Sequence, residues 1–218
     1  MGAIDRLDVE RRLRDIDAGI STVTDRHVDI VAVTKNKRDD VLETAVAAGV
    51  RILGENYAQE VRAKADVIDR IRARGAEVHF IGQLQTNKVR MVAPHVDMVQ
   101  SVDRQSLVDE LAHRAPGMRV LIQVDTSGGQ GRGGCAPEDV VSLVNAGRSA
   151  GLTVEGLMTV GPAGGDPDAL RSAFALVSGL ANDLGLQVCS MGMSDDHLIA
   201  VEEGSTMVRI GTALLGER

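Results

Sequence analysis

One lysine stands out because of its place in the sequence. Lys35 directly follows the apolar run IVAVT at 30–34. If that run is a strand, the ammonium of Lys35 projects from its end, where a desolvated lysine can lose its proton and attack an aldehyde. Judged by position alone, a solvated loop lysine beside Lys37 and Arg38 is the simpler explanation. Lys35 is therefore a candidate for Schiff-base chemistry that needs support from other residues.

The second candidate is an anion site in the segment 190–212, SMGMSDDHLIAVEEGSTMVRIGT. This segment contains two apolar runs, each followed by an amide-rich turn, one at Ser194 and one at Gly211 and Thr212. In barrels of alternating strands and helices, the loops after strands seven and eight frequently bind phosphate through backbone N–H groups and a hydroxyl. The alternative makes Ser194 an ordinary N-cap and Gly211 an ordinary exit into a C-terminal helix. Spacing alone favours neither interpretation.

Eight short apolar runs must position these groups. Strands rich in Val and Ile without strict alternation favour a parallel sheet covered on both faces. Eight such units, separated by segments of helical spacing, are typical of a closed (β/α)8 TIM barrel, with an open doubly wound sheet as the alternative. An amphipathic helix at 4–20 precedes them, and with no linker in sight we expect one domain over residues 1–218. The runs lie at 29–34, 50–54, 77–81, 96–100, 118–125, 153–160, 186–191 and 206–210.

In such a barrel, chemistry belongs at the C-terminal ends of the strands. The residues that the predicted strands bring to that end include both candidates above. They are Lys35, Glu55, Asn56, Gly82, Gln83, Asp125, Met158, Ser194, Arg209, Gly211 and Thr212.

Composition excludes several classes of function. A net charge of -7 and only three aromatic residues leave neither a basic surface nor stacking side chains for nucleic acid. No run approaches 18 apolar residues and the N-terminus is charged, so we expect no membrane partner and a cytoplasmic location. Cys135 and Cys189 lie far apart and the five histidines lack metal spacing, so neither a disulfide framework nor a metal site is expected.

A glycine-rich stretch offers a competing function. GGQGRGG at 128–134 contains a G-x-G-x-x-G match, the pattern of a dinucleotide-binding turn. The match is weak because Cys135 to Pro137 separate the glycines from the next helix, and Glu155 lies inside a strand rather than at its end. A dinucleotide-dependent enzyme is therefore the least favoured of the three functions considered for this chain; the other two follow below.

Several segments together resemble the pyridoxal phosphate homeostasis proteins, which are related to the N-terminal barrel domain of alanine racemase. They span nearly the whole chain in order. The chain departs from the family pattern at Gln83, where a histidine is common, and at Gly161, where a proline is common; neither Gln83 nor the loop 126–135 receives a role. The matching segments are IVAVTKNK at 30–37, ILGENYAQE at 52–60, HFIGQLQTNK at 79–88, GLMTV at 156–160, and SMGMSDD with GSTMVRIGTALLG within 190–216.

The resemblance implies a one-domain barrel of the alanine racemase N-terminal type that binds pyridoxal 5'-phosphate (PLP). Lys35, on the first strand, would hold the cofactor as an internal aldimine. No metal and no catalytic residue follow from the resemblance. The remaining implied contacts are Asn56 near the cofactor, Met158 lining the pocket, Arg209 facing the pyridine nitrogen, and Ser194, Gly211 and Thr212 holding the phosphate.

The resemblance also implies a role in vitamin B6 homeostasis as a monomeric store, buffer or carrier of PLP that serves PLP-dependent apoenzymes. The alternative is a small PLP-dependent amino-acid racemase. Alanine racemases add a second domain and a facing tyrosine, and this chain offers only Tyr57. An arginine at the pyridine nitrogen also disfavours carbanion chemistry, because it can only donate. Without the ring contact, Arg209 would form a salt bridge with Glu202 or Glu203 at the barrel rim.

Overall fold

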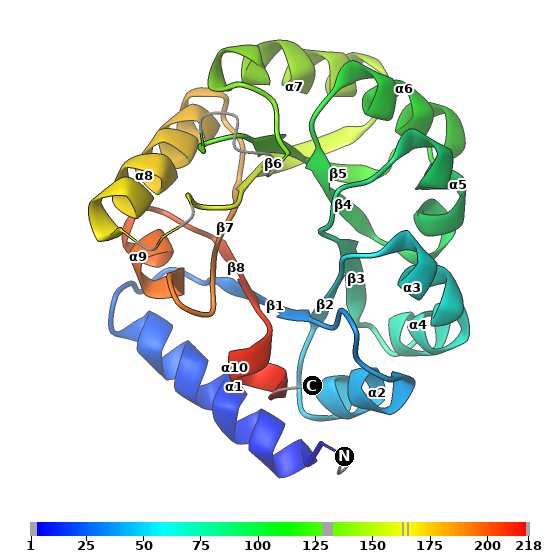
Figure 1. The fold of residues 1–218 in the computed structure, drawn as a ribbon, viewed down its shortest axis with the longest axis vertical. Helices are drawn as coiled ribbons and strands as arrows, with labels where there is room; N and C mark the ends of the chain where they lie inside the picture. The colour runs from blue at the N-terminus through cyan, green and yellow to red at the C-terminus, as the bar shows by residue number, and fades with distance from the viewer. Residues whose placement is uncertain (1–3, 128–132, 163, 165, 217–218) are drawn as a thin grey trace.

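The computed structural model describes residues 4–127, 133–162, 164 and 166–216. Its eight parallel strands pair in chain order and close into a barrel, because β8 pairs with β1 as well as with β7 (Figure 1). The closed barrel confirms the predicted (β/α)8 architecture and excludes the open sheet. The strands are β1 (Asp29–Val33), β2 (Ile52–Glu55), β3 (Glu77–Phe80), β4 (Met98–Val102), β5 (Arg119–Val124), β6 (Thr153–Thr159), β7 (Val188–Met193) and β8 (Met207–Ile210).

Helices form a ring outside the strands (Figure 1). The predicted N-terminal helix is present as α1 (Arg6–Ser21) and begins after Asp5, whose side chain accepts the N–H of Leu7. The others are α2 (Asp39–Ala47), α3 (Ala58–Ala63), α4 (Ala65–Arg72), α5 (Val89–Val92), α6 (Gln105–Arg114), α7 (Val140–Ser149), α8 (Pro167–Asp183), α9 (His197–Glu202) and α10 (Thr212–Leu215), with 3-10 turns at Thr86–Lys88, Ala93–His95 and Pro137–Asp139.

Each predicted strand is present, and β2, β4 and β7 start two residues later than their apolar runs. The ends of the preceding helices explain this for β2 and β7. Gly49 adopts a left-handed conformation after α2, and the N–H of Val50 donates to the carbonyl of Ala45. Gly185 and Leu186 end α8 in the same way. The first apolar residue after each helix therefore caps that helix instead of joining the sheet.

The strands carry apolar side chains on both faces, which explains their lack of alternation. Outward residues such as Leu53 and Phe80 belong to the main core between strands and helices. Two smaller clusters are separate from that core and come from strand residues of the other parity: Val31, Ile52 and Met207 in one, and Met98, Leu121 and Met158 in the other. A sheet buried on both sides in this way is typical of a parallel barrel.

Within the described residues, no helix is long and apolar enough to cross a membrane. The same part of the chain contains no group of three His, Cys, Asp or Glu side chains suited to a metal ion. Cys135 and Cys189 are buried free thiols, and burial raises the pKa of each to about 11, so both are thiols at neutral pH.

Candidate functional site

A cavity of about 220 Å³ lies at the C-terminal end of the barrel. The turns after β1, β2, β7 and β8 all contribute to it, together with Ile81 after β3 and Val160 after β6. A smaller cavity of about 80 Å³ shares part of this lining and adds Lys37 and Gly216. Six of the residues predicted from the sequence line the larger cavity: Lys35, Asn56, Ser194, Arg209, Gly211 and Thr212.

Met158 lies deeper than the other predicted residues. It is buried on β6 and packs in the barrel interior against Met98 and Leu121. The residue that β6 sends to the cavity is Val160, two positions further along the chain. Met158 therefore supports the floor of the barrel interior and is not among the cavity's lining residues.

Lys35 is exposed in the turn that follows β1. The peptide groups on either side of Lys35 are held by side chains from α3 and from the junction of α3 and α4. Lys64 Nζ donates to the carbonyl of Thr34 at 3.0 Å, and the N–H of Asn36 donates to Glu60 Oε2 at 2.7 Å. Asn36 itself adopts a left-handed conformation with φ of 58°. The backbone that presents Lys35 is therefore fixed from both sides.

Lys64 and Glu60, which hold the backbone around Lys35, also belong to a buried ion-pair network that the sequence did not reveal. Lys64 Nζ donates to Glu55 Oε1 and to Glu60 Oε2, both at 2.8 Å, and the Thr34 hydroxyl donates to Glu55 Oε1 at 2.7 Å. Burial raises the pKa of Glu55, and the charge of Lys64 opposes that rise. The only sequence signal was the spacing of four between Glu60 and Lys64, which is common on helix surfaces.

Arg209 is a buried cation, only 4% exposed. Its Nη1 donates to the carbonyl and the hydroxyl of Ser190 at 2.7 and 2.8 Å, and its Nη2 donates to the carbonyl of Thr159 at 2.7 Å. Burial lowers its pKa to about 10, which leaves the guanidinium charged at neutral pH. No carboxylate in the described chain lies within 4.0 Å of it, although Asp196 lies close enough to interact electrostatically.

The salt bridge at the rim is therefore wrong as an account of Arg209. Glu202 and Glu203 both pair with Arg171 from α8. These two residues, at the end of α9 and four to five positions before β8, were the nearest carboxylates in the sequence, but they lie against α8 instead. The guanidinium of Arg209 points into the barrel, where backbone carbonyls and a hydroxyl hold it.

The path of the chain from β7 into α9 depends on Gly192, the last residue but one of β7. This residue adopts a φ of 93°, and a Cβ here would lie 2.6 Å from the Cβ of Ala200. The N-cap of α9 is Asp196, whose carboxylate accepts the N–H of Met193. Ser194 is thus not the ordinary N-cap of the alternative interpretation, and it lies on the cavity wall.

Asn56 carries an orphaned polar atom at the cavity. Its Oδ1 is buried and has no hydrogen-bond partner, a condition that costs free energy unless a ligand or water supplies a donor. Gly82 supports the same residue from behind, because a Cβ at Gly82 would lie 2.0 Å from the carbonyl oxygen of Asn56. The segment after β3 must therefore carry glycine where it passes the residue that follows β2.

The glycine-rich match is not followed directly by the helix that a dinucleotide-binding turn requires. Its residues 128–132 lie outside the described part of the chain. Where the described chain resumes, Cys135 exchanges backbone hydrogen bonds with Gln123 and Asp125 at the end of β5. The next helix, α7, begins only at Val140. The two described glycines, Gly133 and Gly134, therefore do not open a helix, as phosphate binding by that motif requires.

The described geometry can bind an anionic aldehyde. The cavity combines one primary amine, one buried guanidinium, two hydroxyls and an unpartnered amide oxygen. An amine can condense with an aldehyde, and hydroxyl and backbone N–H groups can donate to a phosphate. The protein is therefore a (β/α)8 barrel whose cavity, at the C-terminal ends of the strands, is suited to an anionic aldehyde.

The family model of the alanine racemase N-terminal domain matches residues 10–218. The chain therefore belongs to that family, which confirms the resemblance drawn from its sequence segments. Alanine racemase of Corynebacterium glutamicum, 20% identical, superimposes with a TM-score of 0.72 over 97% of this chain and 60% of that one, which shows the shared fold.

Within this family, the chain belongs with the pyridoxal phosphate homeostasis proteins. The protein of that name from Pseudomonas aeruginosa is 41% identical over 199 residues, which cover 88% of this chain and 85% of that protein. PipY of Synechococcus elongatus, solved without PLP, is 30% identical with a TM-score of 0.86 over 95% of this chain and all of PipY. The structure of PipY with PLP bound is 28% identical, with a TM-score of 0.77 over the same shares.

Proposed function

We propose that this protein binds PLP in the C-terminal cavity and acts in PLP homeostasis as a store, buffer or carrier. The observation that carries the proposal is the pair of cations, Lys35 and Arg209, that face one cavity without a carboxylate partner in the described chain. A buried cation is costly unless something compensates it. An anionic ligand with an acceptor nitrogen supplies that compensation, and PipY with PLP bound is a relative in which such a ligand is present.

Each site residue predicted from the sequence has a part in this proposal. The amine of Lys35 forms a Schiff base with the aldehyde of PLP. Thr212 and Ser194, with the backbone at Gly211, hold the phosphate. Arg209 donates to the pyridine nitrogen, and Asn56 contacts the ring from β2, while Met158 supports the pocket from below.

Arg209 favours a carrier over an enzyme. A carboxylate at the pyridine nitrogen keeps that nitrogen protonated and makes PLP an electron sink. A guanidinium can only donate, so it keeps the nitrogen unprotonated and the ring a poor stabiliser of carbanions. Tyr57, the one tyrosine, is 48% exposed and is not among the lining residues, so it does not supply a second acid/base group.

The wider setting follows from the same role. We place the protein in the cytoplasm as a monomer, where it would pass PLP to PLP-dependent apoenzymes. A small amino-acid racemase is the second candidate, because the barrel resembles that of alanine racemase. It requires measurable turnover, which a carrier does not.

Titration of the purified protein with PLP tests the proposal. We expect a visible absorption band that saturates at one PLP per chain. At a hundredfold excess of free PLP over the dissociation constant, binding should add about 2.7 kcal/mol to the free energy of unfolding. Absence of both the band and the stabilisation would contradict PLP binding. Steady racemisation of added amino acids by the saturated protein would replace the carrier with the racemase.

A further inference from the structure

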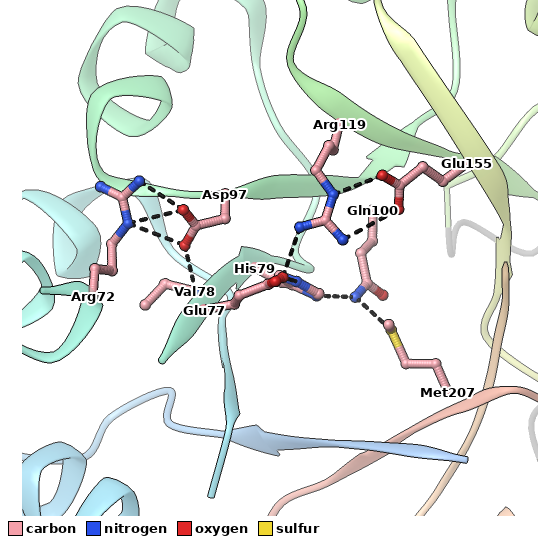
Figure 2. A network of polar contacts seen from close by, with 9 residues as sticks. All are labelled: Arg72, Glu77, Val78, His79, Asp97, Gln100, Arg119, Glu155 and Met207. Atoms are coloured by element: carbon pink, nitrogen blue, oxygen red, sulfur yellow. Dashed lines mark hydrogen bonds and ion pairs between the residues drawn. The ribbon is translucent and has the colours of Figure 1, made fainter. Parts of the chain in front are cut away.

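A continuous hydrogen-bonded chain of side chains crosses the barrel interior beneath the cavity. From Arg209 it passes to the hydroxyl of Ser190 at 2.8 Å, and from there to Gln100 Oε1 at 2.7 Å. Gln100 Nε2 then bonds to His79 Nδ1 at 2.8 Å, and His79 Nε2 bonds to Glu77 Oε2 at 3.0 Å. Figure 2 shows the hydrogen bonds that link Gln100, His79 and Glu77.

The three middle residues of this chain are isolated from solvent. Ser190, Gln100 and His79 are each 0% exposed, and they come from β7, β4 and β3. Parallel barrels usually fill this interior with branched aliphatic side chains. Three polar side chains here cost desolvation, and hydrogen bonds to one another and to the two ends offset that cost, together with a bond from Gln100 Nε2 to Met207 Sδ at 3.2 Å (Figure 2).

All bonds in the chain donate in one direction. Arg209 can only donate, so the Ser190 hydroxyl accepts from it and donates its own proton to Gln100. The amide of Gln100 then donates to His79, whose acceptor Nδ1 leaves the remaining proton on Nε2, facing Glu77. The chain therefore begins at a buried cation and ends at a carboxylate.

The far end of the chain lies in a charged cluster at the N-terminal end of the barrel. Arg119 donates to Glu77 Oε2 at 2.8 Å and to Glu155 Oε1 at 2.7 Å, as Figure 2 shows. The bonds from His79 and Arg119 lower the pKa of Glu77 to about 2, which keeps it ionised at neutral pH. This charged cluster lines a cavity of about 240 Å³, to which Asp29 and Arg51 also contribute.

We propose that Ser190, Gln100 and His79 are positioning residues that hold the guanidinium of Arg209 in the cavity and transmit to it the negative charge of Glu77. The inference rests on the proposed function, because the ligand that Arg209 meets is the pyridine ring of PLP. Each bond in an aligned chain polarises the next, so the Ser190 oxygen accepts more strongly while its proton is donated to Gln100. Breaking the chain at any link should therefore alter the proton affinity of bound PLP.

The substitution Gln100→Met tests this coupling, because it keeps the volume but breaks the chain in its middle. The matched control is Arg72→Met, which removes the bonds of Arg72 to Asp97, shown beside the chain in Figure 2 but not linked to Arg209. The measured quantity is the pH midpoint of the visible band of bound PLP. We expect Gln100→Met to move it by at least about 0.5 pH unit, a threefold change in proton affinity, in the same direction as Arg209→Gln.

A double-variant cycle separates positioning from a general structural effect. In an Arg209→Gln background, Gln100→Met should add no further shift, while Arg72→Met should leave the midpoint unchanged in both backgrounds. An unmoved midpoint in Gln100→Met, or an equal shift in the Arg209→Gln background, would overturn the inference. If Gln100→Met fails to fold, Ser190→Ala removes the neighbouring link and is tested against the same expectations.

A measurement on the ligand-free protein separates this inference from the proposed function. The side-chain nitrogen resonances of Arg209, assigned by their loss in Arg209→Gln, should show hindered guanidinium rotation in the wild type. Gln100→Met should speed that rotation and Arg72→Met should not. Faster rotation in Gln100→Met without any PLP band in the wild type would keep the positioning role and refute PLP binding. Unchanged rotation alongside a normal PLP band would refute the positioning role alone.

Discussion

The two ends of the barrel treat charge in opposite ways. At the N-terminal end, two half-buried cations are paired: Arg119 bonds to Glu77 and Glu155, and Arg72 bonds to both oxygens of Asp97. At the C-terminal end, the described chain places no carboxylate within 4.0 Å of either Lys35 or Arg209. The paired charges are compensated within the fold, whereas an unpaired cation on a cavity wall is available to bind an anionic ligand.

Cavity size alone would choose the wrong end. The cavities of about 320 and 240 Å³ near the N-terminal ends of the strands are both larger than the 220 Å³ cavity at the C-terminal end. Charged residues line the 240 Å³ cavity, but Glu77 and Glu155 there both pair with Arg119. Arg14 and Arg51 at the N-terminal end, unpaired in the described chain, are exposed, so the buried guanidinium of Arg209 beside the amine of Lys35 distinguishes the smaller cavity as the candidate binding site.

The largest expected effect is at Lys35. Lys35→Ala should abolish the visible PLP band, because the Schiff base needs this amine, and borohydride reduction followed by peptide mapping should place the wild-type adduct on this residue. The side chain is exposed, so the free energy of unfolding without ligand should stay within about 0.5 kcal/mol of the wild type.

Lys37 is the matched control for Lys35. It lies two residues further along and donates to the carbonyl of Gly216 at 2.8 Å. Lys37→Ala should keep both the band and the adduct. A reduced adduct on Lys37, Lys64 or Lys88 in the wild type would contradict the assignment to Lys35.

Lys64 breaks the simple contrast between the two ends, because it is a paired cation at the binding end. Lys64→Met leaves the buried carboxylate of Glu55 without compensation, and we expect a loss of about 3–5 kcal/mol in the free energy of unfolding near neutral pH. Denaturant unfolding measures it. The freed Thr34 carbonyl should also loosen the turn that presents Lys35 and weaken PLP binding.

The pH dependence of this loss has a definite sign. Burial already raises the pKa of Glu55 in the fold, so its ionisation destabilises the protein as the pH rises through that pKa. Without Lys64 the rise is larger. The loss in Lys64→Met should therefore shrink as the pH falls and Glu55 becomes protonated, and Glu55→Gln in the same chain should restore part of the stability. A loss independent of pH would show that the charge of Glu55 is not its cause.

Local patterns in the sequence were sufficient to predict the strands and the end at which the site lies. Lys35 and Arg209 could be placed at strand ends because the apolar runs before or around them are short and contiguous. The partners of these residues could not be predicted. Ser190 and Gln100 lie ninety positions apart inside two apolar runs, and only closure of the barrel brings them together.

The same limit explains why the alternative for Arg209, a salt bridge at the rim, does not form. Sequence proximity favours Glu202 and Glu203 as its partners, but Arg171 from α8 takes both. Likewise, Lys64 reaches the carbonyl of Thr34 across thirty positions. Periodicity reports which face a side chain occupies, whereas the side chains it meets there depend on elements distant in the sequence.

A smaller effect should separate the phosphate contacts from the Schiff base. Thr212→Val removes one hydroxyl of similar volume from the cavity wall, and we expect about a tenfold loss in affinity for PLP, the value of one hydrogen bond to a charged group. Pyridoxal, which lacks the phosphate, should bind wild type and variant equally and more weakly than PLP. Calorimetric titration of both ligands measures this difference. An equal loss of affinity for PLP and pyridoxal would show that Thr212 does not contact the phosphate.

The smallest expected effect is at the paired end. The pKa of Glu77 is lowered to about 2, first by the hydrogen bond from His79 and then by Arg119, so its carboxylate stabilises the fold above the unfolded pKa of about 4.3. That contribution is lost as the pH falls from about 5 toward 2. Because the side chain is 41% exposed, solvent screening limits the contribution to about 1 kcal/mol. Glu77→Gln keeps an acceptor for His79 but removes the charge, so its free energy of unfolding, measured in urea between about pH 5 and 3, should fall less steeply than that of the wild type. Parallel slopes would mean that the charge of Glu77 does not stabilise the fold, and the contrast between the two ends would then rest on the unpaired cations alone.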